Sequence, residues 1–323
     1  MYCVQLLPIE MISLCNLASK VDPEILIKNI SWHFLSQNEN IDLEFLTKYE
    51  KKPWHFADLF RNSAITLTEF CNHPAHVLYY RQFSANPNLT IEFVLKNRTE
   101  NWDWYLISRN KAITMHDVYN NRTLHWNYHG ISANPNLTID FVLNDLSQNW
   151  SWYDISRNKS ITLQDICDNP QLPWDMCALL ANPNITMTFS LSIITKISRF
   201  AGAEYDIAWG ILSQNKAITM DDVFSNIHRR WDYFTLPLNP NLTLAFILET
   251  LNIKNKRCNW NWSDISTNKS ITIEEIQENP QLPWDILSIS SNPNITMEYV
   301  LANIKEKPMF QHRLCKNPGF FIY

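Results

Sequence analysis

The stretch Trp102-Asp-Trp-Tyr-Leu-Ile-Ser-Arg-Asn110-Lys-Ala-Ile-Thr114 returns in altered form along most of this 323-residue chain. The asparagine that closes its first half recurs throughout, and seven consecutive copies lie 24 residues apart. These asparagines are Asn38, Asn62, Asn86, Asn110, Asn134, Asn158, Asn182, Asn215, Asn239, Asn268 and Asn292. Four positions after each one comes a threonine, or an aspartate in the earliest full copy. A fixed period of this length indicates an array of stacked repeats.

The segment after each threonine predicts a short helix. A threonine oxygen can accept a hydrogen bond from the first helical turn, and an acidic residue follows three positions later in alternate copies, as in Thr114 and Asp117. This is the spacing of a capping box. In the other copies the acid lies two positions later, as in Thr138 and Asp140. The unit therefore alternates with a period of 48 residues.

A second helix is predicted between this helix and the next asparagine. Proline-containing runs such as residues 169–174 and 279–284 predict a break, with the second helix beginning near Trp174 or Trp284. An aromatic residue there is followed three positions later by Ile or Leu, as in Trp104 and Ile107 or Tyr233 and Leu236, which places both on one helical face. One copy cannot bury enough apolar surface to fold alone. We therefore expect an all-α fold, an α-solenoid of about eleven 24-residue helix-turn-helix repeats.

A leucine-rich-repeat-like solenoid is the alternative. Residues 107–114 also resemble the Leu-Ser-x-Asn-x-Leu-Thr core of leucine-rich repeats, whose period can be 24 and in which an asparagine ladder is expected. Two features disfavour it. One extra residue separates Asn from Ile, and the position four before Asn holds Leu106, Gly130 or Asp154, which breaks the alternation of a strand.

The period also divides the chain. Residues 1–30 hold a degenerate copy that we interpret as an N-terminal capping repeat, residues 31–303 form the solenoid, and residues 304–323 form a C-terminal cap. Insertions of nine and five residues interrupt the period near residues 190–205 and 250–258. Insertions in arrays usually map to loops on one face, which is often the binding face.

Composition excludes several classes of protein. Only four glycines leave little room for phosphate-cradling loops, and a net charge of −5 gives no general attraction for nucleic acid or anionic membranes. The seven cysteines are scattered, which disfavours a disulfide framework and fits a reducing compartment. Residues 1–20 match neither a signal peptide nor a membrane span. We expect a soluble intracellular protein that is not secreted and does not bind membranes.

As a whole, the pattern Trp-x-Trp-x-x-Ile-Ser-x-Asn-Pro-x-Ile-Thr resembles the tandem-repeat proteins that large, mimivirus-like DNA viruses of amoebae encode in many copies. The resemblance covers roughly residues 31–300, and the frequent Asn, Ile and Lys fit an AT-rich genome. It implies a repeat protein in the host cytoplasm or the virion. It carries over no activity, catalytic residue or cofactor.

No residue pattern predicts catalysis or a metal site. His125 and His129 have a spacing that can bind a metal on a helix, but no carboxylate or cysteine recurs beside them, and His73 and His76 are no stronger. The recurring acids are explained as helix caps, and the serine before each asparagine is equally periodic. We expect no enzyme activity, no cofactor and no metal.

These observations favour a non-enzymatic scaffold for protein–protein interaction, with a host or virion partner if the chain is viral. The two positions directly after the aromatic residue of the second helix vary between copies. Stacking of the copies should bring these positions into one continuous stripe. Tyrosine is a frequent interface anchor. The predicted partner-binding residues are Tyr105, His129, Tyr153, Asp154 and Phe234. The alternative is an RNA- or DNA-binding helical repeat protein whose aromatic residues stack on bases; the oligomeric state stays open.

Overall fold

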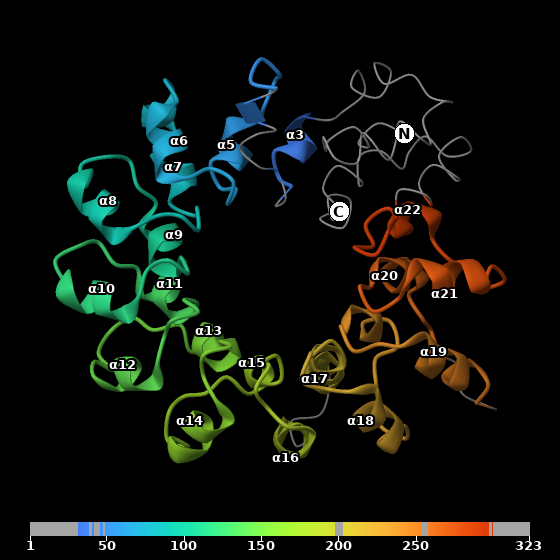
Figure 1. Ribbon diagram of the computed structural model, residues 1–323. Helices are drawn as coiled ribbons and strands as arrows, with labels where there is room; N and C mark the ends of the chain where they lie inside the picture. Colours follow the sequence, from blue (N-terminus) through green and yellow to red (C-terminus); the bar gives the residue numbers. More distant parts are fainter. Residues whose placement is uncertain are drawn as a thin grey trace, which may run out of the picture. The chain divides into compact units, whose positions relative to one another are not determined.

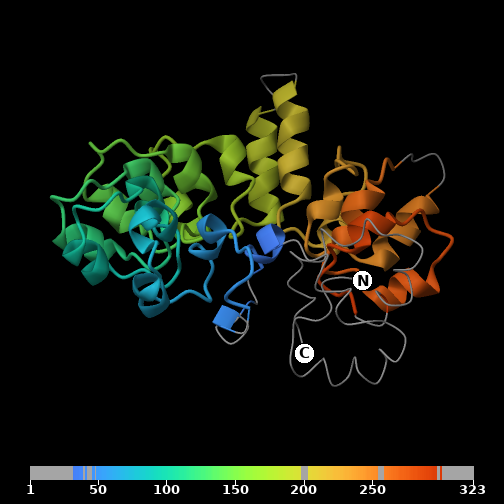
Figure 2. The same cartoon turned by 90° about the horizontal axis from the view of Figure 1, so that it is seen from above.

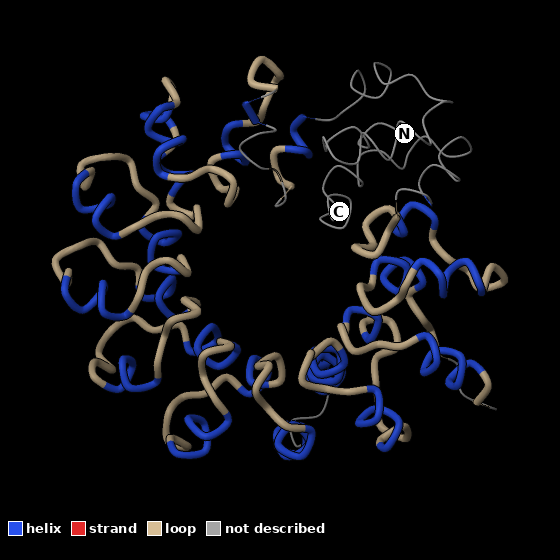
Figure 3. The backbone as a smooth tube through the Cα atoms, in the orientation of Figure 1, coloured by secondary structure: helices blue, strands red, loops and turns tan. Residues whose placement is uncertain are grey.

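The computed structural model describes residues 32–38, 41, 46–47, 49–197, 203–253, 258–296 and 299. Throughout these residues the backbone forms helices and turns, and no strand occurs among them (Figure 3). The all-α prediction is therefore confirmed, and the leucine-rich-repeat-like alternative is wrong for this part of the chain. The two predicted caps, residues 1–30 and 304–323, lie outside the described residues.

Most described copies contribute two short helices. The first begins after the threonine, and these first helices are α6 (Leu67–Asn72), α8 (Ile91–Lys96), α10 (Met115–Asn120), α12 (Ile139–Leu143), α14 (Leu163–Asp168), α16 (Met187–Ile197), α18 (Met220–Ser225), α19 (Leu244–Leu251) and α21 (Ile273–Glu278). The second helices precede the asparagine and are α3 (Trp32–Leu35), α5 (Phe56–Leu59), α7 (Tyr80–Phe83), α9 (Trp104–Arg109), α11 (Tyr128–Ser132), α13 (Trp152–Arg157), α15 (Met176–Leu179), α17 (Ala203–Ser213), α20 (Trp262–Thr267) and α22 (Ile286–Ile289). Two 3₁₀ helices, η1 (His76–Leu78) and η3 (Leu236–Leu238), complete the described elements.

The chain divides into two compact units. One comprises residues 66–242 with 246–260, and the other comprises residues 1–65 with 243–245 and 261–323. Within the first unit, α9, α11, α13 and α15 follow one another along the inside of a curve, and α8, α10, α12 and α14 follow along its outside (Figure 1). None of the described helices has the length and apolar character needed to cross a bilayer.

The predicted threonine caps are present. Thr138 Oγ1 accepts a hydrogen bond from the backbone N–H of Phe141 at 3.3 Å, at the start of α12. In α14, Thr162 forms a complete capping box: its hydroxyl accepts from the N–H of Asp165 at 3.1 Å, and the Asp165 carboxylate accepts from the N–H of Thr162 at 2.8 Å. Both exchanges satisfy amides that the helix leaves unpaired.

The second helix has a cap of its own that the sequence analysis did not foresee. In several copies the residue after the tryptophan caps this helix, as when Asp175 accepts from the N–H of Ala178 at 2.8 Å. The helix therefore begins at Met176, two residues beyond Trp174. The Trp174 indole instead donates to the carbonyl of Asn169 at 2.8 Å and closes the turn between the helices.

The recurring asparagines form a buried ladder. The Asn158 side-chain amide donates to the carbonyls of Ser132 and Asn134 in the preceding copy, both at 2.9 Å, and its oxygen accepts from the N–H of Ser160 at 3.0 Å. The same rung recurs in both units, for example from Asn292 to the carbonyl of Asn268 at 3.1 Å. The asparagine carbonyls of the ladder also accept a backbone N–H within their own turn, as from Leu137 to Asn134 at 3.1 Å, so each rung adds a bond from the next copy to a turn that is already closed. An asparagine ladder is expected in leucine-rich repeats, and here it occurs in a helical fold.

The recurring serines form a second link between copies. The Ser132 hydroxyl donates to the carbonyl of Tyr128 at 2.7 Å, and it accepts from the N–H of Ser151 in the next copy at 2.9 Å. Equivalent bonds join Ser108 to Asn127 and Ser156 to Asp175, each at 2.9 Å. The periodic polar residues are therefore used to join neighbouring copies.

Apolar residues fill the space between these polar rows. Ile107, Ile131 and Ile155 of successive second helices are completely buried. Aromatic rings of neighbouring copies meet edge to face, as between Trp152 and Trp174, whose centroids are 5.5 Å apart. Each copy thus buries its apolar face against the next, as the stacking argument requires.

The first insertion lengthens helices. Helices α16 and α17 each have 11 residues, whereas the equivalent helices α14 and α15 have six and four. The two long helices pack against each other and stand out together from the rest of their unit (Figure 2). Insertions in arrays usually form loops, but over the described residues the apolar, helix-like sequence of this insertion continues helix α16 to Ile197. Of the second insertion, residues 254–257 lie outside the description.

The copy around Tyr233 also departs from the prediction. Tyr233 and Leu236 were expected on a second α-helix, but Tyr233 lies in a turn and Leu236 begins η3. Pro237 explains the difference because it lacks the N–H that a continuing α-helix needs.

Candidate functional site: a basic groove within residues 66–242

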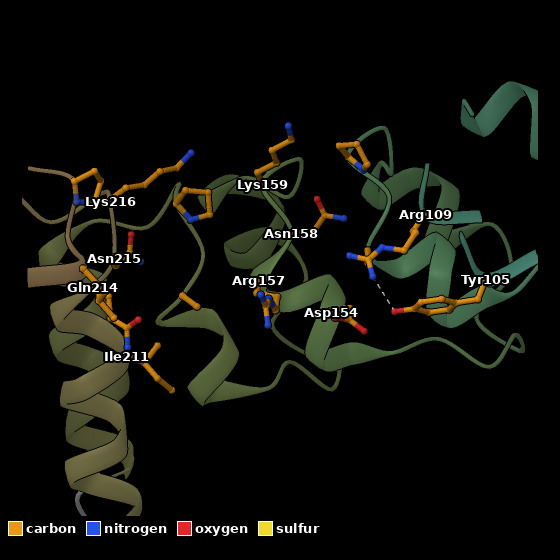
Figure 4. Close-up of a pocket in the computed structure, with 16 residues that line it drawn as sticks. Tyr105, Arg109, Asp154, Arg157, Asn158, Lys159, Ile211, Gln214, Asn215 and Lys216 are labelled. Carbon is orange, nitrogen blue, oxygen red and sulfur yellow. Dashed lines mark hydrogen bonds between the residues drawn. The ribbon is translucent and has the colours of Figure 1, made fainter. Parts of the chain in front are cut away.

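An open groove of about 930 Å³ runs along the inner helices of the unit that comprises residues 66–242 (Figure 4). The ends of α9, α13 and α17 and the turns after α11, α15 and η3 form its walls. Its charged lining residues are Arg109, Arg157, Lys159, Lys216 and Asp154. The groove therefore carries four cationic side chains and one carboxylate, in a chain whose net charge is −5.

The asparagine ladder places these cations in the groove. Asn158 is buried, whereas its neighbours Arg157 and Lys159 are exposed. Because the rung fixes the turn, the two flanking side chains extend away from the core, into the groove. Alternate copies place alanine and proline at the same positions, as at Ala133 and Pro135. The cations thus recur in every second copy, in phase with the 48-residue alternation.

A tyrosine holds each arginine. The Arg109 Nη1 donates to the hydroxyl of Tyr105 at 3.3 Å, and its guanidinium lies 5.4 Å from the centre of the same ring (Figure 4). Tyr153 and Arg157 repeat the arrangement, with a bond of 3.2 Å and the same ring distance. Such cation–π contacts contribute about 0.5–1 kcal/mol at exposed sites. These contacts restrict the orientation of each guanidinium group in the absence of a ligand.

The groove cations keep their charge available. Among the residues that the structure describes, none of the four has a carboxylate within ion-pair distance. Asp154, the one acid in the lining, accepts a hydrogen bond from the Ser151 hydroxyl at 2.7 Å. The groove can therefore bind an anionic ligand without first breaking an internal ion pair.

A smaller cavity continues the row of charge. It has a volume of about 270 Å³, and Arg109 and Lys111 are among its lining residues. Arg109 lines both cavities. The cationic surface therefore extends by one further lysine toward α7.

Two of the five predicted partner-binding residues line the groove, and three do not. Tyr105 and Asp154 belong to its lining. His129, Tyr153 and Phe234 are exposed outside it, although Tyr153 contacts the lining residue Arg157. The predicted stripe and the groove thus overlap only in part.

In the copy of α11 the second of the two variable positions serves packing. Gly130 is buried, and a Cβ added to it would lie 2.7 Å from the Tyr105 carbonyl oxygen and 2.8 Å from the Ser108 Cβ. This close approach of α9 and α11 accounts for the glycine.

Sequence reasoning missed the cations. The signal that could have found them is the residue after the ladder asparagine, which is lysine in every second copy from Lys111 onward: Lys111, Lys159, Lys216 and Lys269. These lysines follow the same 48-residue alternation as the acidic residues of the helix caps.

The two histidine pairs weighed in the sequence lie in different local settings. His125 precedes α11 and His129 lies on it, so the pair does not share a helix face. His76 Nδ1 lies 2.8 Å from the carbonyl of His73, a local contact. A different group, His33, His55 and Asp58, brings its ligand atoms within 4.8 Å of one another.

These features define an all-α repeat protein with a preformed basic groove. No family model, curated protein or solved structure matches the chain. The resemblance to viral tandem repeats therefore rests on the motif alone.

Proposed function

We propose that this protein is a non-enzymatic scaffold that binds a partner protein, and that the inner groove takes an extended acidic segment of that partner. The groove itself carries the proposal: four exposed cations without internal ion pairs line a hollow of about 930 Å³. The residues common to all copies are used in the core and the ladders, which leaves this surface free to differ from copy to copy.

The spacing of the arginines suits an extended chain. Packed helices lie about 8–10 Å apart, so Arg109 on α9 and Arg157 on α13, with α11 between them, are about 16–20 Å apart. An extended peptide rises about 3.3 Å per residue, so five or six residues span this distance. Carboxylates of such a segment can form the paired hydrogen bonds that guanidinium groups favour.

The charge pattern favours an acidic peptide over a nucleic acid. Asp154 within the groove would repel a uniformly charged phosphate backbone, whereas a peptide can place a neutral or basic residue there. The rings of Tyr105 and Tyr153 each already lie against an arginine of the same helix, so they are poorly placed to stack on bases. The net charge of −5 points the same way. The viral resemblance extends the proposal to a partner in the host cell or the virion.

Fluorescence anisotropy with labelled oligomers tests the proposal. We expect an oligo-glutamate peptide to bind, an oligo-lysine peptide not to bind, and the double substitution R109Q/R157Q to weaken glutamate binding about tenfold. Salt should weaken binding as well, because the contacts are exposed.

Arg122→Gln is the matched control. Arg122 lies 4.2 Å from the centre of the Tyr119 ring, so it forms the same kind of pair, but it does not line the groove. Binding that is equally weakened by R122Q would show a general charge effect and contradict the groove. Tighter binding of single-stranded RNA or DNA than of oligo-glutamate would favour the nucleic-acid alternative.

A further inference from the structure

We propose that His33, His55 and Asp58 form a binding site for a divalent transition-metal ion of the zinc type. The three residues come from α3 and from the start of α5, in two consecutive copies. They share no residue with the basic groove, so a test of one proposal does not decide the other.

The ligand atoms already have the spacing of a metal site. Asp58 Oδ2 lies 2.9 Å from His55 Nδ1 and 3.8 Å from His33 Nδ1. In a tetrahedral zinc site with bonds of about 2.0–2.1 Å, neighbouring ligand atoms are about 3.3 Å apart, between these two distances. The two imidazole rings meet edge to face with centroids 4.4 Å apart. Small side-chain movements would therefore bring all three ligands onto one ion.

A neighbouring amide holds the carboxylate in place. Gln37 Nε2 donates to Asp58 Oδ2 at 2.6 Å. A carboxylate oxygen held in this way faces both imidazoles, and the carboxylate is the form of the group that binds a metal ion. Hydrogen-bonded ligands of this kind are typical of metal sites.

The residues at equivalent positions of other copies can be compared with His55 and Asp58. His55 occupies the capping position of its second helix, where other copies have Asp103, Asn127 or Ser151 with a capping hydrogen bond. His55 makes no such bond to α5. Asp58 stands where two other copies also have an aspartate, and the carboxylates of Asp154 and Asp264 each accept a hydrogen bond from the side chain at the capping position. In the copy of Asp58 the capping position holds a histidine instead, so an imidazole lies against the carboxylate.

The chemistry of the ligand set indicates which ion fits. Two imidazoles and one carboxylate suit Zn²⁺ and neighbouring first-row ions, whereas Mg²⁺ and Ca²⁺ prefer oxygen ligands alone. Three protein ligands leave a fourth position open on the exposed side, because the side chains of His33 and His55 are 51% and 46% exposed. A bound ion would join two consecutive copies.

Isothermal titration calorimetry of the full reduced chain with ZnCl₂ tests the site. We expect H33N and H55N each to weaken one binding event at least tenfold, and Q37A to weaken it several-fold through the freed carboxylate. The H125N/H129N variant is the matched control, since it removes two histidines that lack a carboxylate partner, and it should bind Zn²⁺ as the parent does.

Cobalt separates this site from the cysteines. Co²⁺ at His33, His55 and Asp58 should show visible ligand-field bands without the thiolate charge-transfer bands that cysteine binding gives. Loss of these bands in H33N, in a variant whose circular dichroism is unchanged, would support the site. A parent protein that binds no Zn²⁺, or a H33N variant that binds it as tightly as the parent, overturns the proposal.

Discussion

At the residue scale, one buried asparagine per copy does work that helical repeats often leave to apolar packing. Its amide pairs carbonyls of the preceding copy, and its oxygen fixes the turn of its own copy. A buried carbonyl without a partner costs about 1–3 kcal/mol, so each rung opposes a sizeable penalty. The contact between neighbouring copies and the hydrogen bonding of their buried backbone groups therefore depend on the same side chain.

Replacing Asn158 by alanine should lower the free energy of unfolding by about 3 kcal/mol, because the Ser132 carbonyl and the Ser160 N–H lose this hydrogen bond and the Asn134 carbonyl keeps only its bond from the N–H of Leu137. Chemical denaturation followed by tryptophan fluorescence measures the change. Asn136→Ala is the control: Asn136 donates to the carbonyls of Lys111 and Ile113 at 2.8 and 3.0 Å, but it is exposed, so water replaces it. A loss at Asn136 as large as that at Asn158 would contradict the argument.

At the scale of helices, contacts between copies are closest where a side chain is missing. Helices α9 and α11 approach so closely that Gly130 has no room for a methyl group. Gly210, in the middle of α17, is different: the nearest atom to an added Cβ is Asp232 Oδ2, at 3.4 Å.

Gly130→Ala should therefore destabilise the protein by about 1–3 kcal/mol, since the helices must move apart. Gly210→Ala should be neutral or stabilising by up to about 1 kcal/mol, because alanine favours helix over glycine. Thermal unfolding of the two variants under one condition gives the comparison. Equal shifts in Tm would mean that α9 and α11 can move apart at little cost in free energy, and would contradict the prediction for Gly130.

Sequence reasoning recovers those elements whose signals are local. Thr162 and Asp165 are three residues apart, so a capping box could be predicted from spacing alone. The start of α15 could not, because Trp174 forms its bond five residues back and leaves the cap to Asp175. Leu236 was assigned to an α-helix because its spacing from Tyr233 was weighed without the effect of Pro237.

The groove was harder to predict, because it depends on contacts between copies rather than on local spacing. Tyr105 and Asp154 attracted notice because their positions vary between copies. Arg109 and Lys159 did not, since a charge in a turn is usually just solvated. They face the groove only because the buried ladder beside them fixes the turn, and that ladder had been associated with strands.

At the scale of the whole molecule, short helices joined by ordered turns set the spectroscopic signature. Most described helices contain only four to six residues, and only α16 and α17 reach 11. The far-ultraviolet circular dichroism spectrum should show the double minimum of α-helix, with an amplitude per residue below that of a bundle of long helices. A spectrum with the single minimum of β-sheet would contradict the fold. Myoglobin, an all-α protein with longer helices, serves as the reference.

The ladder spans the first insertion without a gap: Asn215 donates to the carbonyl of Asn182 at 2.9 Å, although 33 residues separate them rather than 24. The acceptor is a backbone oxygen, which every amino acid possesses. A copy therefore needs no matching side chain in its neighbour in order to join it. Such an array is modular, so a unit can be duplicated, lost or lengthened while the adjoining units keep their own sequences.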